Sequence, residues 1–467
     1  MTRFKAWIST AAALSVLFGA LVSAQEDEKQ LPPKGGTPKN FTLPEKDTFA
    51  LPNGLRVTLV QIGSVPKATV RIVIRSGNLN EGDQTWLADL SGDFLLEGTA
   101  SRNSEDIARE AAAMGGQVTV TVTEDRTTIS GDALSDFVPQ MAALLADVVR
   151  NPEFPASELE RLKRDRLRQL SVARTRPQQM ALAAFRKAMY GDHPYGRLLP
   201  DEDQLAGYTL DAARNFYSDN FGAQRTHVFV AGMFDATATR AALESAFDDW
   251  KRGPGILLNV PEPVEGKVVV DMIDRPGAVQ SNVYLGLPTP DPSSEDWIPL
   301  QISNTLLGGF FSSRITRNIR EDKGYTYSPR SAVSTRYRDA YWVQTAAVTT
   351  DVTGLAIQEI LYEIDNLANN PPPIAELDGV KNYAAGVFVL QNSTRSGIIN
   401  VLSYLDLHEL PESYLTNYVS DVFALTPEQI SETVSKYIRE EDMTLVVVGD
   451  RGQVSEQVAN WIGTAPE

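Results

Sequence analysis

The stretch NPEFPASELERLK, residues 151–163, has a second copy in the chain, NPPPIAELDGVK at residues 370–381. Three residues correspond at an offset of 218: Glu158 to Glu376, Leu159 to Leu377 and Lys163 to Lys381. A second pair of segments, VFVAG ending at Gly232 and LVVVG ending at Gly449, gives an offset of 217. Agreement within one residue over this period indicates two copies of one domain.

Helical and strand periodicities alternate loosely in each copy. Strands are predicted at 55–61, 68–77, 117–123, 127–131, 226–234, 267–273, 281–288, 325–333, 340–348 and 444–450. Helices are predicted at 86–99, 104–114, 134–149, 155–173, 178–189, 236–250, 297–309, 312–322 and 454–462, with further long helices before the last strand. The predicted fold class is α+β, with two homologous domains, each a mainly antiparallel sheet packed with helices. If the two domains are related by an approximate twofold axis, they would enclose a space between them. The chain would then form one half of a clam-shell chamber.

Segments of different composition divide the chain. Residues 1–24 carry Arg3 and Lys5, an apolar run and a Val-Ser-Ala end, the pattern of a signal peptide, with an uncleaved anchor as the alternative. Residues 25–46 are a polar, Pro-rich lead-in, and residues 251–266 are a Pro- and Gly-rich linker between domains at 47–250 and 267–467. We therefore expect an exported, periplasmic protein with no stable membrane insertion after cleavage.

The composition excludes several classes of site. The 467 residues include no cysteine, which removes disulfides and any zinc site built on sulfur. The net charge is −17, with 43 basic and 60 acidic residues, and such a chain repels the phosphates of nucleic acid. A hydrophobic fraction of 42% is ordinary for a globular protein.

The stretch WLADLSGDFLLEGT, residues 86–99, carries the first candidate site. At helical spacing Asp89, Gly92 and Asp93 share one face, because residues three and four apart are neighbours on a helix. The apolar side chains on the packing face are Leu87, Leu90, Phe94 and Leu95. A pair of exposed aspartates four residues apart more often marks a solvated helix face than a metal site.

Four segments together resemble the insulinase/pitrilysin family of zinc peptidases, in its bacterial two-domain form. They are LPNGLRV at 51–57, WLADLSGDFLLEGT at 86–99, GDHPYGR at 191–197, and NTLLGGFFSSRITRNIREDKGYTYS at 304–328. The resemblance covers nearly the whole chain after the lead-in. It implies a zinc helix of the form H-x-x-E-H at 86–99, in which two histidines bind zinc and the glutamate activates water.

This chain departs from the family pattern at all four zinc positions. Asp89 and Asp93 stand where the family has histidines, and Gly92 stands where it has the catalytic glutamate. The family's third ligand, a glutamate on the following long helix, corresponds here to Gln169, or to a residue one position away. We therefore expect no metal in this chain; a hard cation on the two carboxylates is the minor alternative. His193, His227 and His408 are isolated and are expected to be structural.

The resemblance also implies an Arg/Tyr pair in the second domain, and here the chain keeps it as Arg320 and Tyr327. In the family this pair holds the substrate main chain and stabilises the oxyanion. A guanidinium and a phenol suit that role because both donate hydrogen bonds to developing negative charge. Structural alternatives are a helix C-terminal charge for Arg320 and a packing role for Tyr327 or Tyr325.

Some two-domain family members are heterodimers in which one chain brings the zinc motif and the other brings the Arg/Tyr pair. The profile of this chain implies the second kind of subunit. Its expected partner is a homologous zinc-bearing chain, with zinc in the partner only, and its expected substrates are unfolded peptides. A peptide-binding or scaffold protein of the cell envelope, without peptidase activity, is the alternative.

Overall fold

The computed structural model describes residues 39–261 and 272–459. The predicted signal peptide, most of the lead-in, and parts of the predicted strand at 267–273 and helix at 454–462 lie outside the described residues. The strands are β1 Lys46–Ala50, β2 Arg56–Gln61, β3 Lys67–Ile74, β4 Gly98–Thr99, β5 Arg102–Asn103, β6 Val118–Val122, β7 Thr127–Leu134, β8 Thr226–Gly232, β9 Ile273–Asp274, β10 Gln280–Thr289, β11 Arg330–Arg336, β12 Asp339–Thr349 and β13 Thr444–Gly449.

The α-helices alternate with these strands. They are α2 Leu87–Phe94, α3 Ser104–Ala113, α4 Val138–Arg150, α5 Leu159–Thr175, α6 Pro177–Tyr190, α7 Glu202–Ala206, α8 Leu210–Asn220, α9 Ala236–Phe247, α10 Trp297–Asn304, α11 Arg314–Thr316, α12 Thr353–Asn369, α13 Ile374–Asn392, α14 Arg395–His408, α15 Ser413–Ala424, α16 Pro427–Tyr437 and α17 Arg451–Val454. Two π-helical turns, Thr305–Gly309 and Arg317–Asp322, extend α10 and α11.

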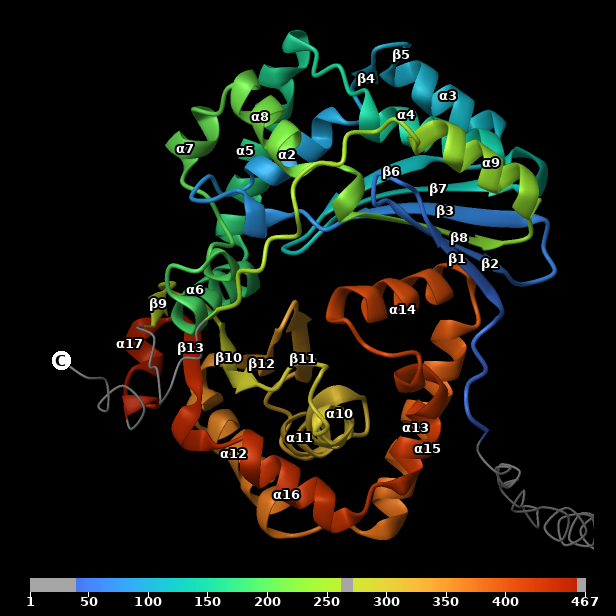
Figure 1. The fold of residues 1–467 in the computed structure, drawn as a ribbon. Coiled ribbons are helices and arrows are strands. Elements are labelled where there is room, and N and C mark those ends of the chain that lie inside the picture. The colour runs from blue at the N-terminus through green and yellow to red at the C-terminus, as the bar shows by residue number, and fades with distance from the viewer. Residues whose placement is uncertain (1–38, 262–271, 460–467) are drawn as a thin grey trace, which may run out of the picture. The chain divides into compact units, whose positions relative to one another are not determined.

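Each half of the chain builds one large sheet, and the first half also contains the two-stranded sheet β4-β5 (Figure 1). The first has the order β1-β2-β8-β3-β7-β6, and only the neighbours β2 and β8 are parallel. The second has the order β11-β12-β10-β13-β9, and only β13 and β9 are parallel. Two large apolar cores lie within residues 51–250 and 272–458. The α+β class with mainly antiparallel sheets is thus confirmed, while the exact domain boundaries stay a prediction.

The two halves exchange one helix each. Helix α6 of the first half packs on β13 and β10 of the second sheet, where Phe185 and Met189 join Tyr341 and Val446 in one apolar cluster. Helix α14 of the second half packs on β8 and β3 of the first sheet. The apolar cluster there contains Val60, Val73, Phe229, Ala231, Ile398, Ile399 and Leu402. Each sheet is therefore buried on both faces, and for that reason β8 is buried along its whole length and is apolar from Val228 onward.

The starting residues of these helices, Pro177 and Arg395, are 218 residues apart, which matches the offset found in the sequence. Both helices have a clear start signal. Proline occupies the first turn of α6, where its missing N–H costs nothing, and Thr394 caps α14 by accepting a hydrogen bond from the Gly397 N–H. The internal repeat is thus also a repeat of elements, and the copies interlock.

A buried polar network joins the halves beside α6. The Glu124 carboxylate accepts hydrogen bonds from Arg186 of the first half at 2.6 Å and from Arg336 of the second at 3.3 Å. These two cations hold the pKa of Glu124 down at about 2, against the opposing effect of its burial. Tyr195, from the GDHPYGR segment, donates to Asp125, and its carbonyl accepts from Arg186. This segment therefore serves the contact between the halves.

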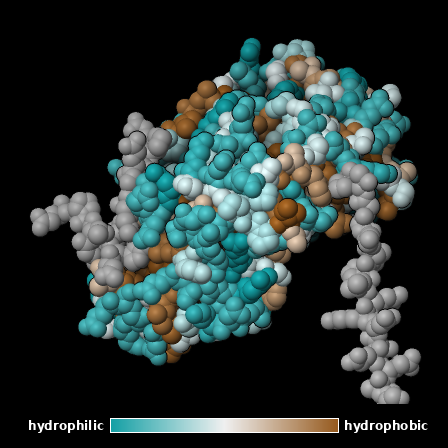
Figure 2. Space-filling view, turned by 90° about the horizontal axis from the view of Figure 1, so that it is seen from below, coloured by the Kyte–Doolittle hydropathy of each residue, from teal (hydrophilic) through white to brown (hydrophobic). Residues whose placement is uncertain are grey.

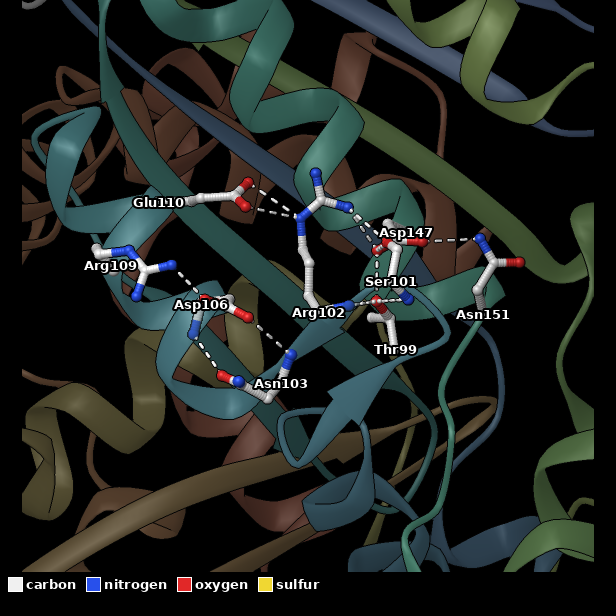
Figure 3. Close-up of polar contacts among 9 residues, drawn as sticks. All are labelled: Thr99, Ser101, Arg102, Asn103, Asp106, Arg109, Glu110, Asp147 and Asn151. Atoms are coloured by element: carbon white, nitrogen blue, oxygen red, sulfur yellow. Dashed lines mark hydrogen bonds and ion pairs between the residues drawn. The ribbon is translucent and has the colours of Figure 1, made fainter.

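The Gly-Thr after α2 fixes the turn into α3 (Figure 3). The Thr99 hydroxyl donates to Asp147 at 2.7 Å and accepts from the backbone N–H groups of Ser101 and Arg102. Arg102 lies between Glu110 and Asp147 and binds both. Gly98 has φ +145°, and a Cβ there would meet the Arg102 carbonyl at 3.1 Å, so glycine is required. This turn holds the C-terminal end of α2 in place.

Several predicted elements differ from the structure. The helix predicted at 86–99 ends at Phe94, and Gly98–Thr99 form β4. The lead-in was expected to reach residue 46, but Lys46 already begins β1, which pairs with β2. The strand expected at 325–333 begins only at Arg330, because Gly324 at φ +67° ends the π-helical turn and Pro329 lacks a backbone donor. Tyr327 lies in the irregular segment 325–329, and its side chain is exposed to solvent.

The face shown in Figure 2 is mostly hydrophilic, with apolar residues in small separate patches. Within the described residues, every helix is too short or too polar to span a membrane.

We expect Phe185→Ala to lower the free energy of unfolding by about 3–5 kcal/mol, because the ring is fully buried between the two halves. Urea unfolding measures this, with the exposed Val172→Ala on α5 as a control that should change stability by less than about 0.5 kcal/mol. A loss below 1 kcal/mol for Phe185→Ala would contradict the exchanged packing of α6.

Candidate functional site

Helix α2 presents two opposite faces. Leu87, Leu90 and Phe94 are buried in the first core, as predicted from their spacing. Asp89 and Asp93 lie on the other face, where their side chains keep 18% and 31% of their exposure. The expectation of a freely solvated pair is wrong, because both carboxylates are bound.

The guanidinium of Arg166, on α5, binds both aspartates. Its Nε and Nη2 donate to the two carboxylate oxygens of Asp93, each at 2.7 Å. Its Nη1 donates to Asp89 Oδ1 at 3.1 Å, and Nη2 also reaches the Asp89 carbonyl at 3.1 Å. A planar donor that meets one carboxylate at two points is the strong form of ion pair. We call Asp89, Asp93 and Arg166 the Arg166 cluster.

The charges in this cluster support one another. Burial raises the pKa of Asp89, and Arg166 and the Asn78 amide, which donates to Asp89 at 2.8 Å, partly offset that rise. Burial alone would lower the pKa of Arg166, but Asp93 and Asp89 outweigh it, and the pKa lies above its ordinary value. Arg166 therefore stays charged and neutralises the carboxylates.

Gly92 lies against strand β6. A Cβ added at Gly92 would come within 2.7 Å of Val122 Cγ2. Real Cβ atoms do not approach that closely, and the γ-methyl of a β-branched residue moves only with its backbone or by leaving its rotamer. A side chain at position 92, where the family has its catalytic glutamate, would therefore force Val122 to move, and the glycine present has no group that can act as a base.

The residues present do not fit zinc. The oxygen atoms of Asp89 and Asp93 are engaged by a fixed cation, and the exposed Gln169 lies with its Oε1 3.3 Å from Arg166 Nη1. In the described ranges, 39–261 and 272–459, no three histidine or carboxylate side chains come together as metal ligands. A guanidinium occupies the place between the helices where the family pattern calls for a metal ion.

Arg166 is a residue of this site that was not identified when the sequence was considered alone. It precedes Gln169 by three positions on the same helix, so it faces α2 from the turn before. The available signal in the sequence was a basic residue one helical turn before Gln169, on the helix that was expected to face Asp89 and Asp93.

The second half brings Arg320 and Tyr327 together. Arg320 lies on the π-helical turn 317–322, with its Cζ 4.9 Å from the centre of the Tyr327 ring. The centre of the Phe311 ring, which the sequence did not single out, lies 4.3 Å from the same Cζ. Tyr327 is 78% and Phe311 62% exposed. The Arg320 side chain itself is partly exposed, and its Nε pairs with Glu321 at 3.1 Å, so the two Nη groups are the donors left for a ligand.

The three histidines lie in separate structural contacts. His193 Nδ1 accepts from the Tyr195 N–H, and His227 Nε2 lies 2.9 Å from the Thr58 hydroxyl. His408 is buried, and burial lowers its pKa to about 4. His193 thus contacts a turn, and His227 links the neighbouring strands β8 and β2.

Arg166→Met should lower the free energy of unfolding at pH 7 by about 3 kcal/mol, because it leaves two half-buried carboxylates without their cation. Burial raises the pKa of Asp89, and without Arg166 that rise in the folded state is less opposed, so the variant gains protons on folding. The deficit should therefore shrink as the pH falls from 7 toward 4. Urea unfolding at several pH values measures this. The exposed Arg164→Met on the same helix is the control, and an equal loss in both variants would argue against the cluster.

Glu81, close to Asp89 of the Arg166 cluster, gives a second expected pH dependence of the folding stability. Burial raises its pKa from 4.5 to about 8, although the N–H groups of Trp86 and Ala88 donate to it. The protonated Glu81 carboxyl stabilises the folded state fully at pH values below its pKa in the unfolded chain. This contribution is lost as the pH rises through 8. Glu81→Gln should remove a slope of up to about 1.4 kcal/mol per pH unit between pH 5 and 8. Unfolding curves across this range test it against the exposed Glu105→Gln; an unchanged slope in Glu81→Gln would refute the shift.

Two family models match the chain. The model described as insulinase (peptidase family M16) matches residues 56–202, and the one described as peptidase M16 inactive domain matches residues 207–383. A protein of Mycobacterium tuberculosis described as an uncharacterized zinc protease is 24% identical over 408 residues, covering 86% of this chain and 92% of that protein. A similarly described protein of Bacillus subtilis is 22% identical and covers 87% and 98%.

Solved structures share the fold. The peptidase M16 inactive domain from Pseudomonas fluorescens has a TM-score of 0.80 at 24% identity and covers 87% of this chain and 98% of its own. A protease from Helicobacter pylori has a TM-score of 0.81 at 17% identity, covering 87% and 100%. With both family models in order along the chain and the fold shared over its length, this chain belongs to the insulinase (M16) peptidase family.

Proposed function

We propose that this chain is the non-metal subunit of an exported peptidase, and that it supplies Arg320 and Tyr327 to a homologous zinc-bearing partner that hydrolyses unfolded peptides. The observation that carries the proposal is the contrast between the two halves. In the first, Arg166 and Val122 close the former metal site. In the second, Arg320 and Tyr327 stay together, with the Tyr327 ring exposed and the Arg320 side chain partly exposed.

The chemistry assigns a limited role to this chain. In the partner, zinc would activate the water that adds to the scissile carbonyl. Arg320 and Tyr327 would donate hydrogen bonds to the carbonyl oxygen as it gains negative charge, and so lower the barrier. The stack of Phe311, Arg320 and Tyr327 reduces the freedom that the guanidinium would lose on binding. Export rests on the N-terminal pattern of Arg3, Lys5 and the apolar run.

The complex purified from the native host should contain zinc and cleave unfolded peptides, whereas this chain alone, supplied with zinc, should not. Removing one oxyanion donor costs a factor on the order of 10²–10³ in kcat. We therefore expect Arg320→Ala and Tyr327→Phe to reduce kcat of the complex by about that factor with a smaller change in KM.

The exposed Arg317→Ala, on the same helical turn, is the matched control and should leave kcat unchanged. Wild-type turnover in Arg320→Ala and Tyr327→Phe complexes would remove the proposed role. Peptide cleavage by the isolated chain would overturn the non-metal assignment itself.

A peptide-binding or scaffold role without peptidase activity is the second candidate. It is favoured by the same closed metal site, and it differs in needing no zinc-bearing partner. A neighbouring reading frame that encodes an intact H-x-x-E-H on a similar fold favours the peptidase subunit. Co-purification without zinc would favour the scaffold.

A further inference from the structure

A large cavity opens in the second half. Its volume is about 1060 Å³, and it is enclosed by α10, β11, α13 and α14, with Arg126 entering from the turn between β6 and β7. The elements around it can be followed in Figure 1. We call it the C-half cavity. It does not include Arg320 or Tyr327 in its wall.

The C-half cavity corresponds to the closed site of the first half. The stretch from Trp297 to Gly309 repeats that from Trp86 to Gly98 at an offset of 211, with the tryptophan, the Leu-Leu pair and the final glycine in register. Helix α10 is thus the counterpart of α2, and α13 that of α5. Arg166 and Val122 fill the first copy of this space, whereas the second copy is open.

The wall of the C-half cavity is positively charged in an acidic protein. Arg126 and Arg330 line it, and no aspartate or glutamate does, although the chain has 60 acidic residues against 43 basic ones. The rest of the wall is aromatic and amide-rich. Its aromatic members are Trp297, Tyr383, Phe388, Tyr404, Tyr414 and Tyr418. Charge complementarity therefore favours an anionic ligand with apolar flanks.

The Arg126 side chain has no hydrogen-bond or ion-pair partner among the described residues. The two carboxylates whose charges act on it, Asp125 and Asp406, are engaged elsewhere. Asp125 accepts from Tyr195 and from the Tyr337 N–H. Asp406 binds Arg56 and faces His227. A half-buried guanidinium with five unused donors is costly to keep unless something binds it.

A second arginine adds to the positive field. Arg71 donates one hydrogen bond to Asn400, a residue of the cavity wall, while its Nε is buried without an acceptor. Burial lowers the pKa of Arg71, and the charge of Arg126 lowers it further, although Asp132 opposes this. The two cations repel each other, and an anion placed beside Arg126 would relieve that repulsion.

We propose that the C-half cavity binds a carboxylate of a peptide through Arg126, with the aromatic wall holding the adjoining residues. The carboxylate can be the peptide's C-terminus or an aspartate or glutamate side chain. The inference rests on the proposed function only in taking the ligand to be a peptide. It gives the subunit a binding site of its own, separate from Arg320 and Tyr327.

Three fluorescein-labelled octapeptides of alanine and tyrosine test this by fluorescence anisotropy with the isolated full chain. One has a free C-terminal carboxylate, one a C-terminal amide, and one the amide with a single internal glutamate. We expect the free acid, the glutamate peptide or both to bind about 10- to 100-fold more tightly than the plain amide, because a charged hydrogen bond is lost in the amide. Tighter binding of the free acid identifies the C-terminus as the source, and tighter binding of the glutamate peptide identifies the side chain.

Arg126→Gln should abolish this preference, and Arg330→Gln, on the exposed side of the cavity, should weaken it less. Arg176→Gln, an exposed arginine of the first half outside the cavity, is the matched control. Arg126→Gln should also raise the Tm, because it removes an unpaired half-buried charge, a gain that a purely structural arginine would not give.

Equal binding of all three peptides, no binding of any, or an unchanged preference in Arg126→Gln would overturn the proposal. These measurements need no partner chain and no hydrolysis. Loss of the peptide preference with Arg320-dependent turnover intact would therefore refute the C-half cavity and leave the proposed function standing.

Discussion

Each sheet of this protein has two apolar faces, and the helices of its own half cover only one of them. The other face is covered by a helix from the opposite half, α6 on the second sheet and α14 on the first. Burying both faces accounts for the apolar strands, and the exchange ties the two halves into one packed body. The network of Glu124, Arg186 and Arg336 lies along the same contact, where burial makes each unpaired charge costly. The site on α2 and the Arg/Tyr pair both depend on this interlocked frame.

The Arg166 cluster shows how α2 is held against α5 at the positions where the family pattern has a metal site. Two carboxylates on the face of α2 toward α5 need a positive charge nearby, and a guanidinium supplies it with fixed geometry. The corresponding region of the second half has no such filling and is a cavity with an arginine in its wall. The two copies of the repeat thus differ here: a guanidinium closes the space in one, and the space is open with a positive wall in the other.

Much of this arrangement can be read from the sequence, and the remainder depends on contacts between distant residues. The repeat offset, most strands and the altered metal positions follow from local patterns. The spacing of Arg320 and Tyr327 is also local, and the structure places them side by side. By contrast, Arg166 meets Asp93 across 73 positions. Its place one turn before Gln169 puts it on the face of α5 toward α2, but the spacing alone does not show that it pairs with both aspartates. The helices α6 and α14 have ordinary amphipathic patterns, which do not reveal that each packs on the other half's sheet. The irregular segment 325–329 depends on one positive φ at Gly324.

The contact of Gly92 with Val122 has a consequence for any attempt to engineer a zinc site into this chain. A glutamate at position 92 would meet Val122 of β6, and histidines at 89 and 93 would leave Arg166 without the carboxylates that balance its charge. Each exchange on its own therefore costs stability, and the costs are coupled because the residues are in contact. A hydrolytic centre on this helix would require positions 122 and 166 to be exchanged together with 89, 92 and 93, so the redesign is cooperative rather than stepwise.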